Sequence, residues 1–330
     1  MERNVVKRPM IVVGGLLVVS LCVTPYASAQ DPAPTACTDC HNEQRDGKHP
    51  GPPQKLLADS VHKTLDCTDC HQTLSMEKLD RAARRPHGDS VKPVNCTECH
   101  EEVGKVYVLH GRMAAGKDPD FPRCRDCHGS HDILPSLNRD SRVHPMNLAV
   151  TCESCHTNVD VIKKHEWLKE EPIKLYESSV HGRATQRGLH MAATCSDCHS
   201  ASGPDGSRTA HRILSAADRE STIFHFNIPD TCGKCHRGIA EDYWEGIHGQ
   251  LVKRGELDAP VCTRCHGEHG ILAASDLRSP VSAARLAEAT CAPCHESALL
   301  SDRHGVPSGR LKSYVDSYHG LKRKAGNVHV

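Results

Sequence analysis

The sequence predicts a mainly α-helical and coil protein, with little or no β-sheet, whose core is not built from its own side chains alone. Only 3% of the 330 residues are aromatic, 25% are charged, and the mean hydropathy is −0.50. Such a chain cannot bury enough apolar surface to offset the entropy lost on folding. No alternation of apolar and polar residues is long enough for a substantial sheet, and turns rich in Pro, Gly, Asp and Ser separate short stretches of chain. An additional apolar component must therefore complete the core.

The charge balance excludes one large class of partners. The chain has 41 basic and 41 acidic residues, whereas a surface that binds nucleic acid needs a basic excess. We therefore expect no nucleic-acid partner.

The N-terminus has the composition of an export signal. Three basic residues lie within the first eight positions, a mostly apolar run follows at residues 10–23, and Ala27-Ser28-Ala29 matches a small-residue cleavage site. This run is short for a membrane span, although an uncleaved N-terminal anchor remains an alternative. We predict a signal peptide at residues 1–29 and an exported protein. The periplasm is the favoured location, with the cell surface or the extracellular space as alternatives.

Nine copies of one pattern, Cys-x-x-Cys-His, contain every cysteine that follows the signal peptide. In this motif the two thiols bond to vinyl-derived carbons of a c-type haem, and the adjacent histidine reaches the iron from one face. The predicted thioether cysteines are Cys37, Cys40, Cys67, Cys70, Cys96, Cys99, Cys124, Cys127, Cys152, Cys155, Cys195, Cys198, Cys232, Cys235, Cys262, Cys265, Cys291 and Cys294. The predicted proximal iron ligands, called motif histidines below, are His41, His71, His100, His128, His156, His199, His236, His266 and His295. The sequence therefore predicts nine covalently attached haem c groups.

Disulfides and zinc sites are the alternatives to haem. Disulfides form in exported proteins, but their geometry does not require a histidine after every second cysteine. A single copy of the motif would also fit a zinc site, whereas nine copies favour haem. On these motifs, from Cys37 to the C-terminus, the sequence resembles the multihaem c-type cytochromes with doubled CxxCH motifs, the cytochrome c3-like family. The resemblance implies short helices wrapped around a chain of haems in an exported protein.

A repeat of two haem motifs lies beneath this pattern. Each unit has an upstream histidine, a first motif, a His-Gly pair, a second motif and a His-x-Ile-Leu segment. We divide the chain into an N-terminal two-haem segment (30–86), unit 1 (87–143), unit 2 (144–224), unit 3 (225–281) and an incomplete unit 4 (282–330), which we interpret as truncated. In units 1 to 3 the His-Gly histidine precedes the second motif by a constant 14 residues, which predicts a fixed local structure.

Short helices are expected at residues 101–110, 240–248 and 309–319, each ending at the glycine of a His-Gly pair. A glycine at such a position would form a left-handed C-cap with little strain. In unit 4 the same context reaches His319-Gly320, and we expect poor order from about Leu321 onward.

Histidine is the predicted sixth ligand of most irons. Of the 25 histidines nine belong to motifs, and no methionine recurs in the repeat, so we expect bis-histidine ligation and low reduction potentials. The predicted distal ligands occupy recurring positions or, for His62, lie just before a motif: His62, His87, His110, His131, His144, His181, His211, His225, His248, His269 and His319. The remaining five are interpreted as non-ligands: His49, His165, His190, His304 and His329.

The first motif of unit 4 departs from the pattern. No histidine lies in the segment just before Cys291, so one distal ligand is missing there. Either His304 replaces it, or one iron is five-coordinate or weakly ligated and could bind a small substrate.

Two functions fit these features. The favoured one is electron transfer along closely spaced haems, because irons with two histidine ligands leave little room for substrate chemistry. The alternative is a multihaem reductase or oxidase of a nitrogen or sulfur oxyanion, which requires one open haem with acid-base groups nearby. No catalytic residue is assigned. Expected partners are other redox proteins, such as quinol-linked membrane cytochromes, terminal reductases or outer-surface cytochromes. Self-association into a longer haem chain is compatible with the favoured function.

Overall fold

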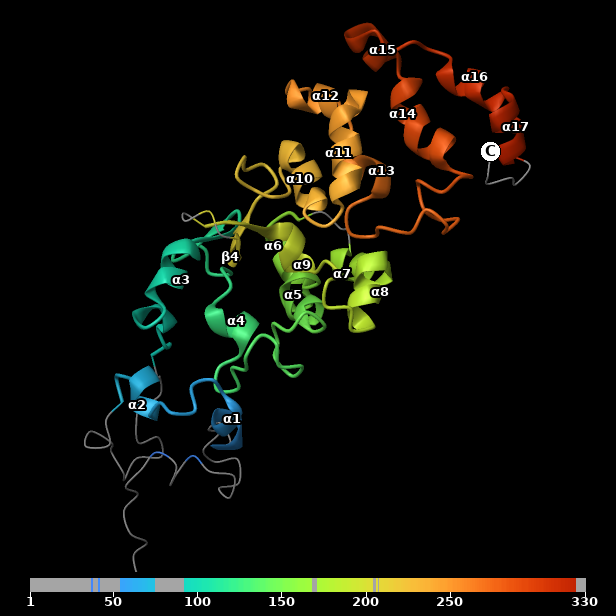
Figure 1. The fold of residues 1–330 in the computed structure, drawn as a ribbon. Coiled ribbons are helices and arrows are strands. Elements are labelled where there is room, and N and C mark those ends of the chain that lie inside the picture. The colour runs from blue at the N-terminus through green and yellow to red at the C-terminus, as the bar shows by residue number, and fades with distance from the viewer. Residues whose placement is uncertain are drawn as a thin grey trace, which may run out of the picture.

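A computed structural model describes residues 37, 41, 54–74, 92–167, 171–203, 206 and 208–324. The predicted signal peptide, Cys40, His49, His87 and His329 lie outside these residues. The described chain is a succession of short helices along an elongated molecule, from α1 (Gln54–Asp59) at one end to α17 (Tyr318–Lys324) at the other (Figure 1). The prediction of a mainly α and coil fold with little β-structure is confirmed.

The helices follow the order of the repeat. The N-terminal segment and unit 1 contain α2 (Cys67–Cys70), the 3-10 helix η3 (Cys96–Glu98), α3 (Glu101–Val106) and α4 (Cys124–His128). Unit 2 contains α5 (Leu148–His156), α6 (Val159–Lys164), α7 (Pro172–Ser178), α8 (Val180–Gln186) and α9 (Cys195–His199). Unit 3 contains the 3-10 helix η4 (His225–Asn227), α10 (Ile228–Gly233), α11 (Arg237–Glu245), α12 (Ile247–Lys253) and α13 (Cys262–His266). Unit 4 contains the π-helix η5 (Leu286–Cys291), α14 (Ala292–His295), α15 (Ala298–His304), α16 (Arg310–Val315) and α17.

One small sheet joins units 1 and 2. Its strands are β1 (Leu109–Gly111), β2 (Met113–Ala114), β3 (Ser200–Ser202) and β4 (Arg208–Leu214), in the order β2-β1-β4-β3. β1 pairs with β4 in parallel, with His110 opposite Ile213, while the two outer pairings are antiparallel. The sheet therefore brings the His-Gly pair of unit 1 beside the His-x-Ile-Leu segment of unit 2.

Few apolar side chains are buried in the described residues. The largest buried apolar cluster consists of Val252, Ala259 and Val261, with partly buried aromatic and aliphatic side chains around it. Large apolar side chains such as Leu137 and Met191 are more than four-fifths exposed. The polypeptide thus has little core of its own, as the composition predicts.

The His-Gly pairs do not end helices, and this prediction is wrong. The preceding helices α3, α11 and α16 end before the pair, at Val106, Glu245 and Val315. In units 2 to 4 the histidine and glycine lie in the first turn of the next helix, α8, α12 or α17. In unit 1 they lie in β1 instead, where Gly111 alone among these glycines has a positive φ, of 63°.

Close packing of backbone explains the glycine. A methyl group on Gly182, Gly249 or Gly320 would overlap the carbonyl oxygen of the tyrosine six residues earlier. The two consecutive helices therefore meet at an angle that only glycine permits. Where a serine precedes the pair, its hydroxyl caps the new helix: Ser179 Oγ accepts from Gly182 N–H at 3.0 Å, and Ser317 Oγ from Gly320 N–H at 3.2 Å.

A tyrosine in each complete unit bonds the chain just before the second motif. The hydroxyls of Tyr107, Tyr176 and Tyr243 donate to the carbonyl oxygens of Pro122, Ala193 and Pro260, at 2.8, 3.0 and 2.9 Å. Each acceptor lies two residues before the first cysteine of a second motif. The loop between the His-Gly pair and the second motif is thus closed at a fixed point.

The end of the described chain is helical. Residues 321–324 continue helix α17, so the expected loss of order from about Leu321 is wrong for these four residues. Residues 325–330 lie outside the described part.

Replacing a His-Gly glycine by alanine tests the close approach of the two helices. Gly249→Ala should destabilise the protein by about 1–3 kcal/mol, the usual cost of forcing a methyl group into packed structure. Gly238→Ala in α11 is the matched control, because its added methyl group would meet nothing within 4 Å and alanine favours helix. Thermal unfolding followed by circular dichroism should show a lower Tm for Gly249→Ala alone. Equal Tm values for both variants would contradict this account of the glycine.

Candidate functional site

Seven motif histidines each face one predicted distal histidine. In every pair the ring centroids are 5.9 to 6.3 Å apart. The pairs, motif histidine first, are His71 with His131, His100 with His62, His128 with His211, His156 with His110, His199 with His269, His236 with His181, and His295 with His248. Each pair therefore combines one histidine from a motif and one from outside the motifs.

The separation fits two imidazoles on opposite faces of one metal ion. A metal–imidazole bond is about 2 Å long, and the ring centroid lies about 1 Å behind the bonding nitrogen, so two such ligands have centroids about 6 Å apart. Burial favours the neutral ring that binds metal. Burial, and to a smaller extent neighbouring histidines, lower the pKa of His110 and of His199 to about 4. The residues present thus fit a haem iron between the members of each pair.

The pairing follows one rule that crosses from unit to unit. Each His-Gly histidine faces the first motif of the next unit, as His181 of unit 2 faces His236 of unit 3. Each His-x-Ile-Leu histidine faces the second motif of the preceding unit, as His269 of unit 3 faces His199 of unit 2. His62, which follows Ser60-Val61 as His181 follows Ser179-Val180, takes the His-Gly role for the N-terminal segment.

Backbone contacts support the same junctions. Val61 N–H donates to the carbonyl oxygen of Ile133, and Val180 N–H to that of Ile271, both at 2.8 Å. At the junction of units 1 and 2 the β1–β4 pairing places His110 opposite Ile213 in the same way. In each case the residue before the distal histidine, or that histidine itself, meets the isoleucine of the next His-x-Ile-Leu segment. The isoleucine carbonyl and the histidine two residues before it thus form one docking segment.

The upstream histidines do not join this arrangement in the described residues. His144 is 1% exposed, its Nδ1 accepts from Met146 N–H, and its ring faces His190 at 5.9 Å. His225 lies edge-on to Phe226. A repeated serine, Ser141 or Ser221, donates to the leucine carbonyl of its own His-x-Ile-Leu segment and marks the same place in both units. His144 lies three residues after this serine and His225 four residues after it, so the two histidines are not structurally equivalent. The third member, His87, lies outside the described part.

Two further predicted ligands face no other histidine in the part of the chain that the structure describes: His266, the motif histidine of α13, and His319 of α17. His41 N–H donates to Cys37 O, which closes the turn of the first motif. His295, whose unit lacks an upstream histidine, faces His248 at 6.2 Å. His304, proposed above as its replacement ligand, bonds Asp258 instead.

Local sequence explains the shape of the second motifs. Helices α2, α4, α9 and α13 begin at the first cysteine, so the two cysteines lie one turn apart on one face. In three of them the aspartate before the second cysteine accepts from the N–H of the residue that precedes the helix: Asp69 from Asp66, Asp126 from Arg123, and Asp197 from Thr194. This cap fixes the turn from which both thiols and the motif histidine project.

The nine motifs are neighbours in sequence order. Within each pair of motifs the two first cysteines lie close enough for one to affect the thiol of the other: together with burial, Cys37 raises the pKa of Cys67, Cys96 that of Cys124, Cys195 that of Cys152, and Cys262 that of Cys232. The same holds between pairs, where, besides burial, Cys96 and Cys99 raise the pKa of Cys70, Cys155 that of Cys127, Cys198 that of Cys232, and Cys291 and Cys294 that of Cys265. These sulfur atoms stand for the thioether sulfurs of attached haems. Every motif thus lies beside the next one along the chain.

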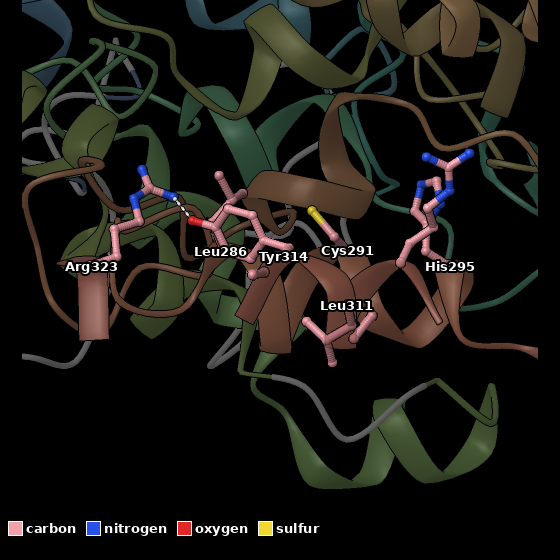
Figure 2. A pocket seen from close by; sticks show the side chains of 9 residues that line it. Leu286, Cys291, His295, Leu311, Tyr314 and Arg323 are labelled. Carbon is pink, nitrogen blue, oxygen red and sulfur yellow. Dashed lines mark hydrogen bonds between the residues drawn. The ribbon is translucent and has the colours of Figure 1, made fainter. Parts of the chain in front are cut away.

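A cavity next to Cys291 shows what would surround one such group (Figure 2). Its volume is about 250 Å³, and its apolar walls include Leu286 and Leu311 beside Cys291 and His295. Arg310 and Arg323 also line it, and Arg323 Nη1 donates to Tyr314 Oη at 3.3 Å. Arginine is well suited to bind the carboxylates of a haem edge. An apolar cavity with a thiol, an imidazole and two guanidinium groups fits a covalently held haem.

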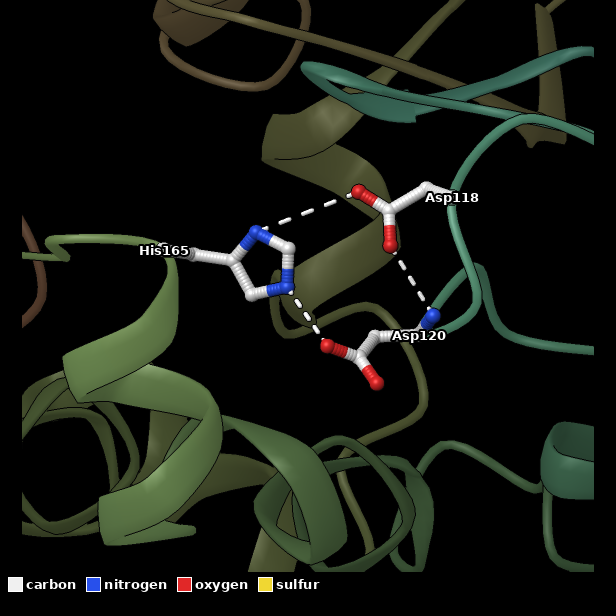
Figure 3. Close-up of side chains that lie close together, drawn as sticks. All are labelled: Asp118, Asp120 and His165. Carbon is white, nitrogen blue, oxygen red and sulfur yellow. Dashed lines mark hydrogen bonds and ion pairs between the residues drawn. The ribbon is translucent and has the colours of Figure 1, made fainter.

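Asp118, Asp120 and His165 form a cluster at the junction of units 1 and 2 (Figure 3). One ligand atom from each lies within 4.8 Å of the others, as a metal site would need. His165 Nε2 is 2.8 Å from Asp120 Oδ2, and Lys164 Nζ is 2.6 Å from the same oxygen. These bonds hold the pKa of Asp120 below its usual value. A lysine ammonium group therefore already balances the carboxylate that a cation would use.

The same constellation recurs at the junction of units 3 and 4. Asp258, which like Asp120 lies four residues before a second motif, accepts from Arg303 at 2.6 Å and from His304 at 2.9 Å. Arg303-His304 and Lys164-His165 lie at the same distance after a first motif. A basic residue and a histidine of one unit thus hold an aspartate of the preceding unit. We interpret both clusters as clamps between units, which agrees with the prediction that His165 and His304 are not haem ligands.

Comparison with known proteins supports the same class of molecule. The chain is similar to cytochrome c-552 of Maridesulfovibrio salexigens, with 21% identity over 205 residues, which cover 53% of this chain and 39% of that protein. This similarity supports a c-type cytochrome. No protein-family model and no solved structure matches the chain. Within the described residues, no helix is long and apolar enough to cross a bilayer.

Sequence reasoning missed two features for which signals exist. The shift between His144 and His225 is visible from either fixed point: they lie three and four residues after the repeated serine, and eight and seven residues before the first cysteine. The clamps are visible as an aspartate four residues before one motif and a basic residue followed by histidine 12 residues after the next. The facing of distal and motif histidines has no such signal, because it arises between units.

Removing a His-Gly histidine should open one iron without releasing its haem. His181→Ala should convert the haem held by Cys232 and Cys235 to high spin, because His181 faces His236. His190→Ala is the matched control and should leave the spin state unchanged, since His190 faces a histidine outside the motifs. Electron paramagnetic resonance of the ferric holoproteins measures both, with haem content checked by mass. An unchanged spectrum in His181→Ala would show that this facing pair does not ligate iron.

Breaking a clamp should loosen one junction only. Asp258→Asn removes the charge that holds Arg303 and His304, so α15 should exchange its amide hydrogens faster while the Tm stays nearly unchanged, as for an exposed ion pair. Asp276→Asn is the control, because Asp276 bonds Arg278 within its own turn. Hydrogen exchange with mass spectrometry measures the effect. Unaltered exchange in Ala298–His304 would argue against a clamp.

Proposed function

We propose that this protein is an exported electron carrier, with nine haem c groups in a continuous chain. The observation that carries this proposal is the order of the cysteine contacts, in which each motif lies beside the next from Cys37 to Cys294. Haem supplies one-electron oxidation and reduction. In the described residues, the cysteines of each motif lie close to those of its sequence neighbours along an elongated molecule, which supports a linear order of haems.

Histidine pairing adds to this proposal. At seven motifs a second imidazole stands where a substrate would otherwise approach the iron, which favours electron transfer over chemistry on a bound substrate. Two imidazole ligands also give lower potentials than one imidazole and one thioether. Low-potential partners are therefore expected: quinol-linked membrane cytochromes, terminal reductases or outer-surface cytochromes. The predicted signal peptide and the resemblance to the cytochrome c3-like group support the periplasm as the location.

The alternative, a reductase of a nitrogen or sulfur oxyanion, is favoured by one observation. His266 faces no second histidine in the described residues, so its iron is the candidate for an open site. The facing of His248 and His295 supports a closed iron at Cys291 rather than an open one.

The haem count is the first measurement. The holoprotein made with a cytochrome c maturation system and cleaved after Ala29 should carry nine haems, one for each motif. Intact-mass spectrometry counts them directly. A fully loaded protein with eight or fewer haems would overturn the proposal that every motif holds one.

Electron redistribution within the molecule tests the function itself. After pulse reduction by less than one electron per protein, the electron should spread among the haems at a rate independent of protein concentration. The variant Cys152→Ala/Cys155→Ala lacks the central attachment point and should confine the electron to one half. Cys291→Ala/Cys294→Ala removes an end point and should leave the remaining chain connected. A wild-type protein that shows no such redistribution but turns over nitrite, hydroxylamine or tetrathionate would instead be a reductase.

A further inference from the structure

Three junctions in this molecule each combine a backbone pairing at the isoleucine of a His-x-Ile-Leu segment with a facing pair of histidines. In the junction of units 2 and 3, Val180 N–H donates to Ile271 O, and His269, two residues earlier, faces the motif histidine His199. Ile133 with His131 acts in the same way at the junction of the N-terminal segment and unit 1. At the junction of units 1 and 2, Ile213 lies opposite His110 in the β1–β4 pairing and His211 faces His128. One His-x-Ile-Leu segment thus satisfies a backbone N–H and an iron site of the preceding unit at once.

Unit 3 has the backbone N–H and the motif histidine that such a segment would meet, but no His-x-Ile-Leu segment lies against them in the described residues. Ile247, the first residue of α12, corresponds to Val180, and its N–H has no acceptor among the described residues. The side chain of Ile247 is 68% exposed, whereas Val180 is half-buried. His266 at the end of α13 corresponds to His199; it is exposed and faces no histidine in the described part, whereas His199 is half-buried. Ile247 and His266 lie on α12 and α13, which correspond to α8 and α9, the two helices of unit 2 that the docking segment bridges.

We propose that this face of unit 3, made by Ile247 of α12 and His266 of α13, binds a His-x-Ile-Leu segment of a partner haem protein. The partner's isoleucine carbonyl would accept from Ile247 N–H, and the partner's histidine would ligate the iron opposite His266. The segment has to come from outside the described residues, because the three such histidines of this chain already face His71, His128 and His199. We choose this occupant because His-x-Ile-Leu segments occupy the corresponding place at the three preceding junctions. The inference rests on the proposed function, since it requires a haem at Cys262 and Cys265.

Binding would form one iron–nitrogen bond and displace a weaker ligand, with no change of oxidation state. The result would be a haem-bearing partner beside the eighth motif of this chain, joined by the same kind of contacts that join the chain's own units. Electrons could therefore leave the molecule through unit 3 as well as through its ends.

A synthetic peptide provides the partner segment in its simplest form. The probe is a copy of residues 267–273, Gly-Glu-His-Gly-Ile-Leu-Ala, added to the mature ferric holoprotein. We expect one high-spin haem without peptide and its conversion to low spin with peptide. The same peptide with alanine in place of its histidine is the matched control and should leave the spin state unchanged.

A protein variant tests the second contact separately. Ile247→Pro removes the N–H while suiting the first position of a helix, and Gly246 before it already has the extended conformation that precedes proline. Loss of one hydrogen bond should weaken peptide binding by roughly 2- to 10-fold. Tyr318→Pro, at the same position of α17 in unit 4, should leave peptide affinity unchanged. The low-spin signal of the His295 iron, which His248 faces, confirms that Ile247→Pro keeps its fold.

Each other outcome overturns the proposal. No high-spin haem in the wild-type protein would mean that another ligand already fills the site opposite His266. A high-spin haem that takes up cyanide or nitrite but not the peptide would make it a small-molecule site. Haem counting and electron redistribution on the same sample distinguish failure of this inference from failure of the proposed function. Nine connected haems with no peptide response would reject only this inference, whereas a missing haem chain would reject the proposed function.

Discussion

The whole arrangement depends on holding two imidazole rings six ångströms apart when each comes from a different unit of the repeat. The polypeptide cannot do this with a core of its own, because only small clusters such as Val252, Ala259 and Val261 are buried. It relies instead on short local devices repeated along the chain. Tyrosine hydroxyls close loops, aspartates cap the motif turns, and glycines let successive helices meet closely. These devices position histidines, and the histidines position the cofactor.

The facing of histidines across junctions has a consequence for stability and assembly. Each of the first three junctions has two facing pairs, one running forward from a His-Gly histidine or His62 and one running back from a His-x-Ile-Leu histidine, and the junction of units 3 and 4 has the forward pair in the described residues. A unit taken alone would therefore lack a ligand on both of its haems, although its sequence repeat suggests an independent module. As for other metal-dependent folds, binding of the group and folding of the chain are expected to be one process. The boundaries drawn from the repeat thus mark sequence periods rather than separable domains.

Much of the site could be predicted from the sequence, and the exceptions have physical causes. The motif cysteines and histidines follow from covalent chemistry that fixes their spacing within five residues, and the fold class follows from composition. The role of the His-Gly glycine was misread because a left-handed cap and a close helix approach both require glycine; only the position of the Tyr176 carbonyl distinguishes them. The partner of each distal histidine could not be predicted, because it depends on how unit 2 lies against unit 3. His144 was grouped with His225 because each lies just upstream of a first motif, although their distances to its first cysteine, eight and seven residues, already differ.

The start of unit 4 shows that the distance between facing histidine rings is kept where the sequence departs from the repeat. In units 2 and 3 the threonine before the first cysteine donates to a carbonyl nine residues earlier, Thr151 to Arg142 and Thr231 to Thr222. In unit 4 Thr290 donates to Pro280, ten residues earlier. The extra residue is absorbed by the π-helix η5, a form that accommodates one inserted residue within a helix. His295 still faces His248 at 6.2 Å, against 6.3 Å and 6.1 Å for the first motifs of units 2 and 3. The backbone therefore changes its helical form where the sequence gains a residue, and the separation of the two imidazoles does not change.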